Sequence, residues 1–121
     1  MARPEAARRI KSYSAASGYV YQYYFYEVEN VRGGAHDGNV YTYMVSADRK
    51  TTFPLHIFVV RAALENWSRA NGRALTGTEE YAVAKMRLFQ AFDEVEDLAA
   101  TRPDLQVDGS NLEALLASLD I

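Results

Sequence analysis

The feature that most constrains the fold is the aromatic run YVYQYYFY at residues 19–26, which holds five tyrosines and one phenylalanine. Tyrosine, phenylalanine and valine favour the extended, pleated backbone, so this run predicts a β-strand. Side chains alternate between the two faces of a strand. One face then carries Tyr19, Tyr21, Tyr23, Phe25 and Glu27, and the other carries Val20, Gln22, Tyr24, Tyr26 and Val28. Both faces are largely apolar, so each of them needs a cover.

Two further strands follow, at residues 40–46 and 53–60, because turn-forming segments rich in glycine, asparagine and aspartate or in polar residues separate them. Apolar residues then recur every three to four positions, which predicts helices, the longest over residues 77–100. Thr76 and Glu79 have the spacing of a capping box at its start.

These segments predict one α+β domain over residues 18–121. Its antiparallel meander has three strands, or four if the N-terminal arm joins, and two or three helices follow and pack on one face. The expected core residues include Trp67, Leu88 and Phe92.

Charge is distributed unevenly along the chain. The formal net charge is −3, and residues 1–17 carry four basic side chains and one glutamate, which leaves −6 for the remainder. We expect residues 1–17 to form a basic arm, either flexible or a short helix. General attraction of the acidic remainder to a phosphate backbone is not expected.

The chain has no cysteine, which excludes a disulfide framework and thiolate chemistry and leaves a reducing cytoplasm as the expected location. No apolar run reaches the length of a membrane span.

The search for catalytic motifs is largely negative. The two histidines lack metal-ligand spacing, and no nucleophile elbow or phosphate-binding loop occurs. We therefore predict no catalytic residue, cofactor or metal, and a protein that is not an enzyme. An enzyme would instead need a water-lined pocket near His56 or Lys85. His56 fits a position on a sheet face, and Lys85, flanked by Tyr81 and Phe89 at helical spacing, fits a contact along aromatic rings.

An acidic set near the end of the long helix comprises Asp93, Glu94, Glu96 and Asp97. On a helix, Asp93 and Asp97 share one polar side while Glu94 and Glu96 diverge, which favours a solvated face over a metal site. Negative charge at a helix C-terminus opposes the helix dipole. We therefore expect pairing with basic residues of a partner chain or of the N-terminal arm.

The aromatic run is the main candidate for function, because helices on one side of the sheet leave its other face uncovered. A second subunit is the simplest cover, so a homodimer or another protein partner is expected. Single-stranded nucleic acid, or a small aromatic or apolar ligand, is the alternative. The expected binding residues are Tyr19, Tyr21, Tyr23, Phe25, Tyr41, Tyr43 and His56, and the opposite assignment of the two faces stays open.

The segments VSADRKTTFPLHIFV, ALENW and GTEEYAVAKMRLFQAFDEV also carry a resemblance. They resemble small conserved bacterial proteins of unknown function, in which a β-meander precedes a pair of helices. The resemblance covers roughly residues 18–100. It implies a bacterial, cytosolic setting and assigns no functional residue.

Overall fold

The computed structural model describes residues 9–32 and 37–121, which form an α+β fold. A five-stranded sheet has its strands in chain order. The strands are β1 (Lys11–Ser14), β2 (Val20–Val31), β3 (Gly38–Ser46), β4 (Phe53–Val60) and β5 (Leu105–Val107). Neighbours are antiparallel except β4 and β5, which are parallel. The predicted α+β class and antiparallel meander are confirmed, with more strands than expected.

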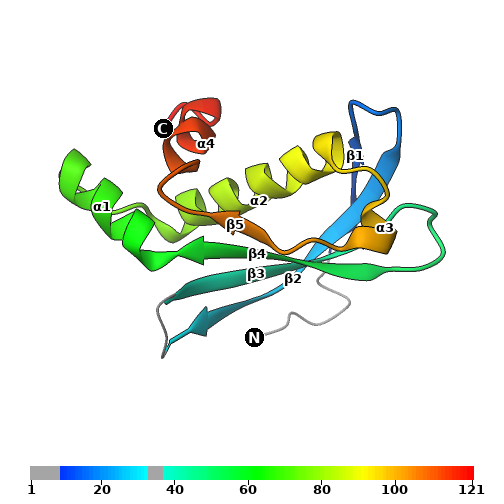
Figure 1. Cartoon of the computed structure of the whole chain (residues 1–121), viewed down its shortest axis with the longest axis horizontal. Helices are drawn as coiled ribbons and strands as arrows, with labels where there is room; N and C mark the ends of the chain where they lie inside the picture. The colour runs from blue at the N-terminus through cyan, green and yellow to red at the C-terminus, as the bar shows by residue number, and fades with distance from the viewer. Residues whose placement is uncertain (1–8, 33–36) are drawn as a thin grey trace.

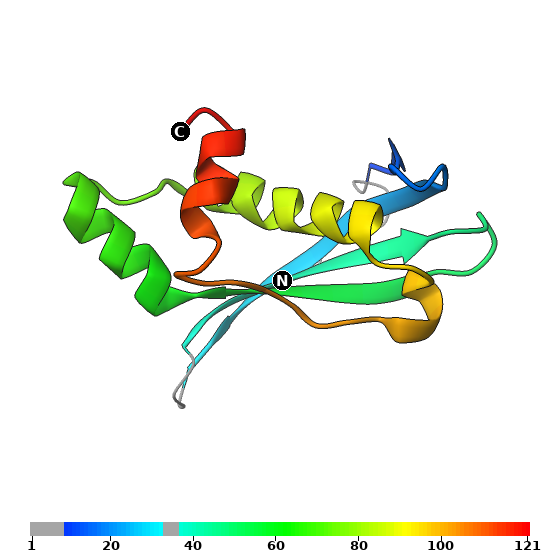
Figure 2. The ribbon, with the colours of Figure 1, turned by 45° about the horizontal axis from the view of Figure 1, so that its top comes forward.

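Four helices accompany the sheet in the described residues, α1 (Arg61–Asn71), α2 (Gly77–Glu94), α3 (Leu98–Thr101) and α4 (Leu112–Ser118). Helix α2 lies across one face of the sheet, and α4 lies beyond α2 on the same side (Figures 1 and 2). The predicted capping box is confirmed, since the Glu79 amide donates to Thr76 Oγ1 and the Thr76 amide donates to the Glu79 carboxylate. None of the helices in the described part of the chain is long and apolar enough to cross a bilayer.

Helix α2 ends earlier than expected. Val95 is extended and Asp97 has a positive φ of 51°, so the predicted helix over residues 77–100 is divided into α2 and the short α3. The break turns the chain back toward the sheet and leaves Leu98 only 1% exposed.

The N-terminal arm contributes strand β1, which is the fourth strand expected if the arm joined the sheet, so Lys11–Ser14 form neither a flexible segment nor a short helix. Lys11 lies opposite Tyr23 in β2, and Ser14 lies opposite Val20. The ring of Tyr13 stacks on Phe89 of α2 at a centroid distance of 4.5 Å, which ties the strand to the helix. The arginines at positions 3 and 8 lie outside the described residues.

Strand β5 was not predicted, because three residues are too few to show alternation. It follows Pro103 and pairs with β4 through Leu105, opposite Ile57. A parallel pair needs a long crossover, and the helical segment between β4 and β5 provides it. Leu105 and Val107 are buried, so the strand completes the core.

The core lies between α2 and the sheet face that points toward it, here called the inner face. Tyr21 stacks on Phe92 with ring centroids 4.6 Å apart. Leu88 and Phe92 are buried as predicted, and Trp67 is half-buried against the core. The buried inner-face residues of the three long strands are Tyr21, Tyr23, Tyr41, Tyr43, Val45, Phe53, Leu55, Ile57 and Val59.

Candidate functional site

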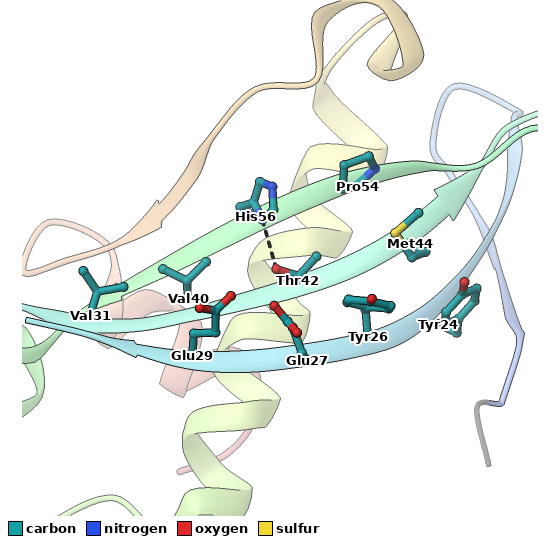
Figure 3. A pocket seen from close by; sticks show the side chains of 10 residues that line it. All are labelled: Tyr24, Tyr26, Glu27, Glu29, Val31, Val40, Thr42, Met44, Pro54 and His56. Carbon is teal, nitrogen blue, oxygen red and sulfur yellow. Dashed lines mark hydrogen bonds between the residues drawn. The ribbon is translucent and has the colours of Figure 1, made fainter. Parts of the chain in front are cut away.

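The opposite side of the sheet, here called the outer face, carries no helix of the described chain (Figures 1 and 2). It contains a hollow of about 470 Å³ on β2, β3 and β4, here called the outer hollow. Figure 3 shows its lining, which is Tyr24, Tyr26, Glu27, Glu29, Val31, Val40, Thr42, Met44, Pro54 and His56.

Strand register brings these side chains together. His56 lies opposite Thr42, and Pro54 lies opposite Met44, so alternate residues of β3 and β4 share the outer face. Tyr24 continues this row onto β2, since it lies opposite Met44.

A β-bulge in β2 adds the two acidic residues to the outer face. Phe25 lies opposite Tyr43 and Glu27 lies opposite Thr42, so Tyr26 is an extra residue without a partner position in β3. Strict alternation predicted Glu27 on the face of Phe25. The extra residue moves Glu27, and with it Glu29, to the face that carries His56.

Glu27 and Glu29 form a close acidic pair (Figure 3). A hydrogen bond that the protonated Glu27 carboxyl donates to Glu29, partial burial and the negative charge of Glu29 raise the pKa of Glu27, while His56 opposes the shift. No lysine or arginine of the described chain forms an ion pair with either carboxylate, since the described ion pairs are Arg61–Asp37 and Arg73–Glu79. The pair is therefore a local excess of negative charge on the outer face.

His56 is exposed and held in place by a neighbour. Its Nδ1 lies 3.0 Å from the Oγ1 of Thr42, a side chain that is only 6% exposed. The histidine and the two carboxylates do not converge as metal ligands, because no group of three such side chains does so among the described residues. The face thus combines an oriented imidazole, an acidic pair and an apolar floor.

Four of the tyrosines expected to bind a partner lie in the core instead of on an exposed face. Tyr21, Tyr23, Tyr41 and Tyr43 are at most 6% exposed and lie on the inner face. The reason lies in β4, whose most apolar side faces α2 and whose register puts Leu55 opposite Tyr43. His56 is consequently on the opposite face from Tyr41 and Tyr43.

Two of these buried tyrosines, Tyr41 and Tyr43, differ in the hydrogen bonding of their hydroxyl groups. The Tyr41 hydroxyl donates to the Glu80 carboxylate at 2.5 Å, and the amide of Asn39 donates to the same oxygen at 2.8 Å. The buried Tyr43 hydroxyl forms no hydrogen bond of ordinary length and angle with the described residues, although the Tyr81 hydroxyl lies near enough to contribute a weak one to its raised pKa. Burial raises the pKa of both phenols, with Glu80 adding to the effect at Tyr41 and the phenol of Tyr81 at Tyr43.

The remaining expected aromatic residues are separated from the outer hollow. Phe25 is half-buried against α2, with its ring 5.4 Å from that of Tyr81 in an edge-to-face arrangement. Tyr19 is 61% exposed and lines a second hollow of about 640 Å³ beside the C-terminus of α2.

The acidic set at the end of α2 borders that second hollow. Asp93 accepts hydrogen bonds from the Tyr13 hydroxyl at 2.8 Å and from the Ala16 amide at 2.9 Å. The described part of the N-terminal segment therefore contacts Asp93 through neutral donors, and the expected pairing of the acidic set with basic side chains stays a prediction.

Lys85 lies along aromatic rings, as its spacing predicted. Its Nζ is 5.9 Å from the ring centroids of Phe89 and Tyr23, the latter replacing the expected Tyr81. Burial and the nearby Lys11 lower the pKa of its ammonium group. Lys85 lines neither the outer hollow nor the second hollow.

Residues of the outer hollow that sequence reasoning did not select include Tyr24, Tyr26 and Met44. A usable signal was present in β4, where Phe53, Leu55, Ile57 and Val59 alternate with Pro54 and His56. Strand β4 has one clearly apolar side, which must face the core. The antiparallel register then determines which side of β3 and β2 faces the core, although the sequences of these two strands are apolar on both sides.

Comparison of the chain with protein-family models, with curated proteins and with solved structures gave no match. The resemblance to small bacterial proteins stays a prediction.

Proposed function

We propose that the protein is a non-enzymatic protein-interaction module that binds its partner, another protein or a second copy, through the outer face. The observation that carries the proposal is the sheet face that no described helix covers, on which apolar and aromatic side chains surround a hollow of about 470 Å³. Exposed apolar patches of this kind mark interaction sites. The absence of cysteine agrees with a cytoplasmic setting for this interaction.

A small apolar or aromatic ligand is the second candidate, because the volume of the outer hollow falls in the range of ligand pockets, roughly 300–1,000 Å³. Such pockets enclose most of the ligand surface. The outer hollow instead lies on the sheet face that no described helix covers (Figures 1 and 2). This geometry favours a macromolecular surface over a small molecule.

Site-specific photo-crosslinking in the native cells tests the proposal. A benzophenone amino acid replaces His56 on the outer face or, as a matched control, the exposed Ala70 on α1. We expect a discrete protein adduct from position 56 only, and loss of that adduct when Met44→Glu places a charge in the hollow.

Light scattering over a range of protein concentrations identifies a second copy, because the measured mass then rises from one chain to two. The proposal fails if position 56 gives no more adduct than position 70 and the chain stays monomeric. Circular dichroism verifies that each variant is folded.

A further inference from the structure

The acidic pair of the outer face forms no ion pair with a described lysine or arginine. The carboxyl groups of Glu27 and Glu29 approach each other on the same side of β2 (Figure 3), and no described lysine or arginine pairs with them. Two adjacent like charges disfavour full ionisation, and a cation placed between them removes this penalty. The described residues of the outer face therefore leave the negative charge of the acidic pair without a lysine or arginine to balance it.

The surroundings of the pair suit a long cationic side chain. Val31 and Val40 lie beside the carboxylates, and Met44 extends the apolar floor (Figure 3). The rings of Tyr24 and Tyr26 line the same hollow. Arginine and lysine carry an apolar stem below a charged head, so they match a surface that is apolar with an acidic end, and their heads also interact with aromatic rings.

The negative charge of the outer hollow distinguishes among the possible binding partners, which are another protein, a second copy of the chain and nucleic acid. Among the described residues, the lining of the outer hollow includes two glutamates and no lysine or arginine. A two-fold, face-to-face pairing of two copies opposes the same patch to itself, and the described lining of this patch offers no lysine or arginine to the acidic pair of the other copy. Nucleic acid would bring phosphates to the carboxylates.

We propose that the outer face binds a protein segment that bears an arginine or lysine, whose charged head lies between Glu27 and Glu29 and whose apolar neighbours lie on Val40 and Met44. This inference rests on the proposed function and defines the chemistry of the partner. An arginine head can bind both carboxylates through its planar, forked donors.

A titration followed by ¹H–¹⁵N NMR tests the inference with defined probes. N-acetyl-arginine methylamide is added to the full chain, and N-acetyl-citrulline methylamide serves as the neutral probe of matched shape. We expect chemical-shift changes to concentrate at Glu27, Glu29 and the paired segment of β3. The citrulline probe should bind about tenfold more weakly, because exposed charge pairs contribute modestly.

Two matched double variants locate the charge effect. Glu27→Gln with Glu29→Gln removes the acidic pair, and Glu94→Gln with Glu96→Gln removes equal charge beside the second hollow. We expect about a tenfold loss of arginine affinity in the first variant and unchanged affinity in the second.

Three outcomes overturn the inference: equal binding of both probes, unchanged affinity without the acidic pair, or loss of binding in the Glu94 and Glu96 variant. Its failure is distinguishable from failure of the proposed function. An adduct at position 56 without selective arginine binding leaves the interaction surface standing and rejects the cationic partner.

Discussion

Removal of the buried Tyr43 hydroxyl is predicted to increase the unfolding free energy, which is unusual for a substitution in the core. The Tyr43 side chain is fully buried, and its hydroxyl forms no hydrogen bond of ordinary length and angle with the described residues. Burying a hydroxyl without a partner costs about 1–3 kcal/mol by protein mutational measures. Tyr43→Phe removes that penalty and loses only the dispersion contacts of one atom, about 0.5 kcal/mol. We therefore expect a gain in unfolding free energy of about 1 kcal/mol.

Tyr41→Phe is the matched control, since it deletes the same atom from a neighbouring position of the same strand. The Tyr41 hydroxyl donates to the carboxylate of Glu80, and hydrogen bonds to charged groups contribute about 1.5–3 kcal/mol. Asn39 continues to donate to that carboxylate after the change. We therefore expect Tyr41→Phe to lower the unfolding free energy by about 1.5 kcal/mol, the lower end of that range.

Urea unfolding monitored by circular dichroism measures both variants against the wild type. The two changes should move the unfolding midpoint in opposite directions. In thermal melts, 1 kcal/mol corresponds to about 4 °C for a domain of this size. Burial raises the pKa of both phenols above the ordinary value of 10.0, so neither ionises at neutral pH.

A loss of 1 kcal/mol or more in Tyr43→Phe would refute the reasoning, because the hydroxyl would then have a partner in solution. Tyr81 is the first candidate, since its phenol contributes to the raised pKa of Tyr43 and the ring centroids are 6.4 Å apart. A double-mutant cycle with Tyr81→Phe would measure that coupling.

Two further predictions concern the sheet. Gly38→Ala should lower the unfolding free energy measured in urea by about 3 kcal/mol, because the added Cβ would lie 2.1 Å from the carbonyl oxygen of Val59. Gly109→Ala is the control and should leave the unfolding free energy nearly unchanged, because nothing lies within 4 Å of its added Cβ. Glu27→Gln should raise the melting temperature at pH 7, because Glu29 raises the pKa of Glu27 in the folded chain. A raised pKa favours folding below the ordinary value of 4.5 and loses this contribution as the pH rises through the folded value. The difference in melting temperature between Glu27→Gln and the wild type should therefore disappear below about pH 4. A difference that stays constant across the pH range would contradict this prediction.

Local sequence patterns predicted much of the fold. The capping box at Thr76 and Glu79 depends on residues three positions apart, and it forms as predicted. Strands β2, β3 and β4 follow from aromatic and β-branched residues between turns. These features are determined within a few residues, so the sequence contains the information directly.

Other features depend on contacts between distant segments, and these were either missed or, in the case of β1, predicted only as one of two alternatives. Strand β5 has three residues and exists because β4 offers an edge. Strand β1 is tied to α2 by Tyr13, which bonds to Asp93 across 80 residues of sequence. The end of α2 at Glu94 likewise depends on where Leu98 finds burial. No window of the sequence reveals such pairings.

The position of the acidic pair shows how one irregularity determines both core and site. Without the extra residue at Tyr26, strict alternation would turn Glu27 and Glu29 toward α2. Two carboxylates would then meet an aromatic layer, where unpaired buried charge is strongly unfavourable. The bulge keeps the inner face apolar and places both charges on the outer face beside Val40. The surface that we propose as the binding site is therefore a direct consequence of how β2 keeps its charges out of the core.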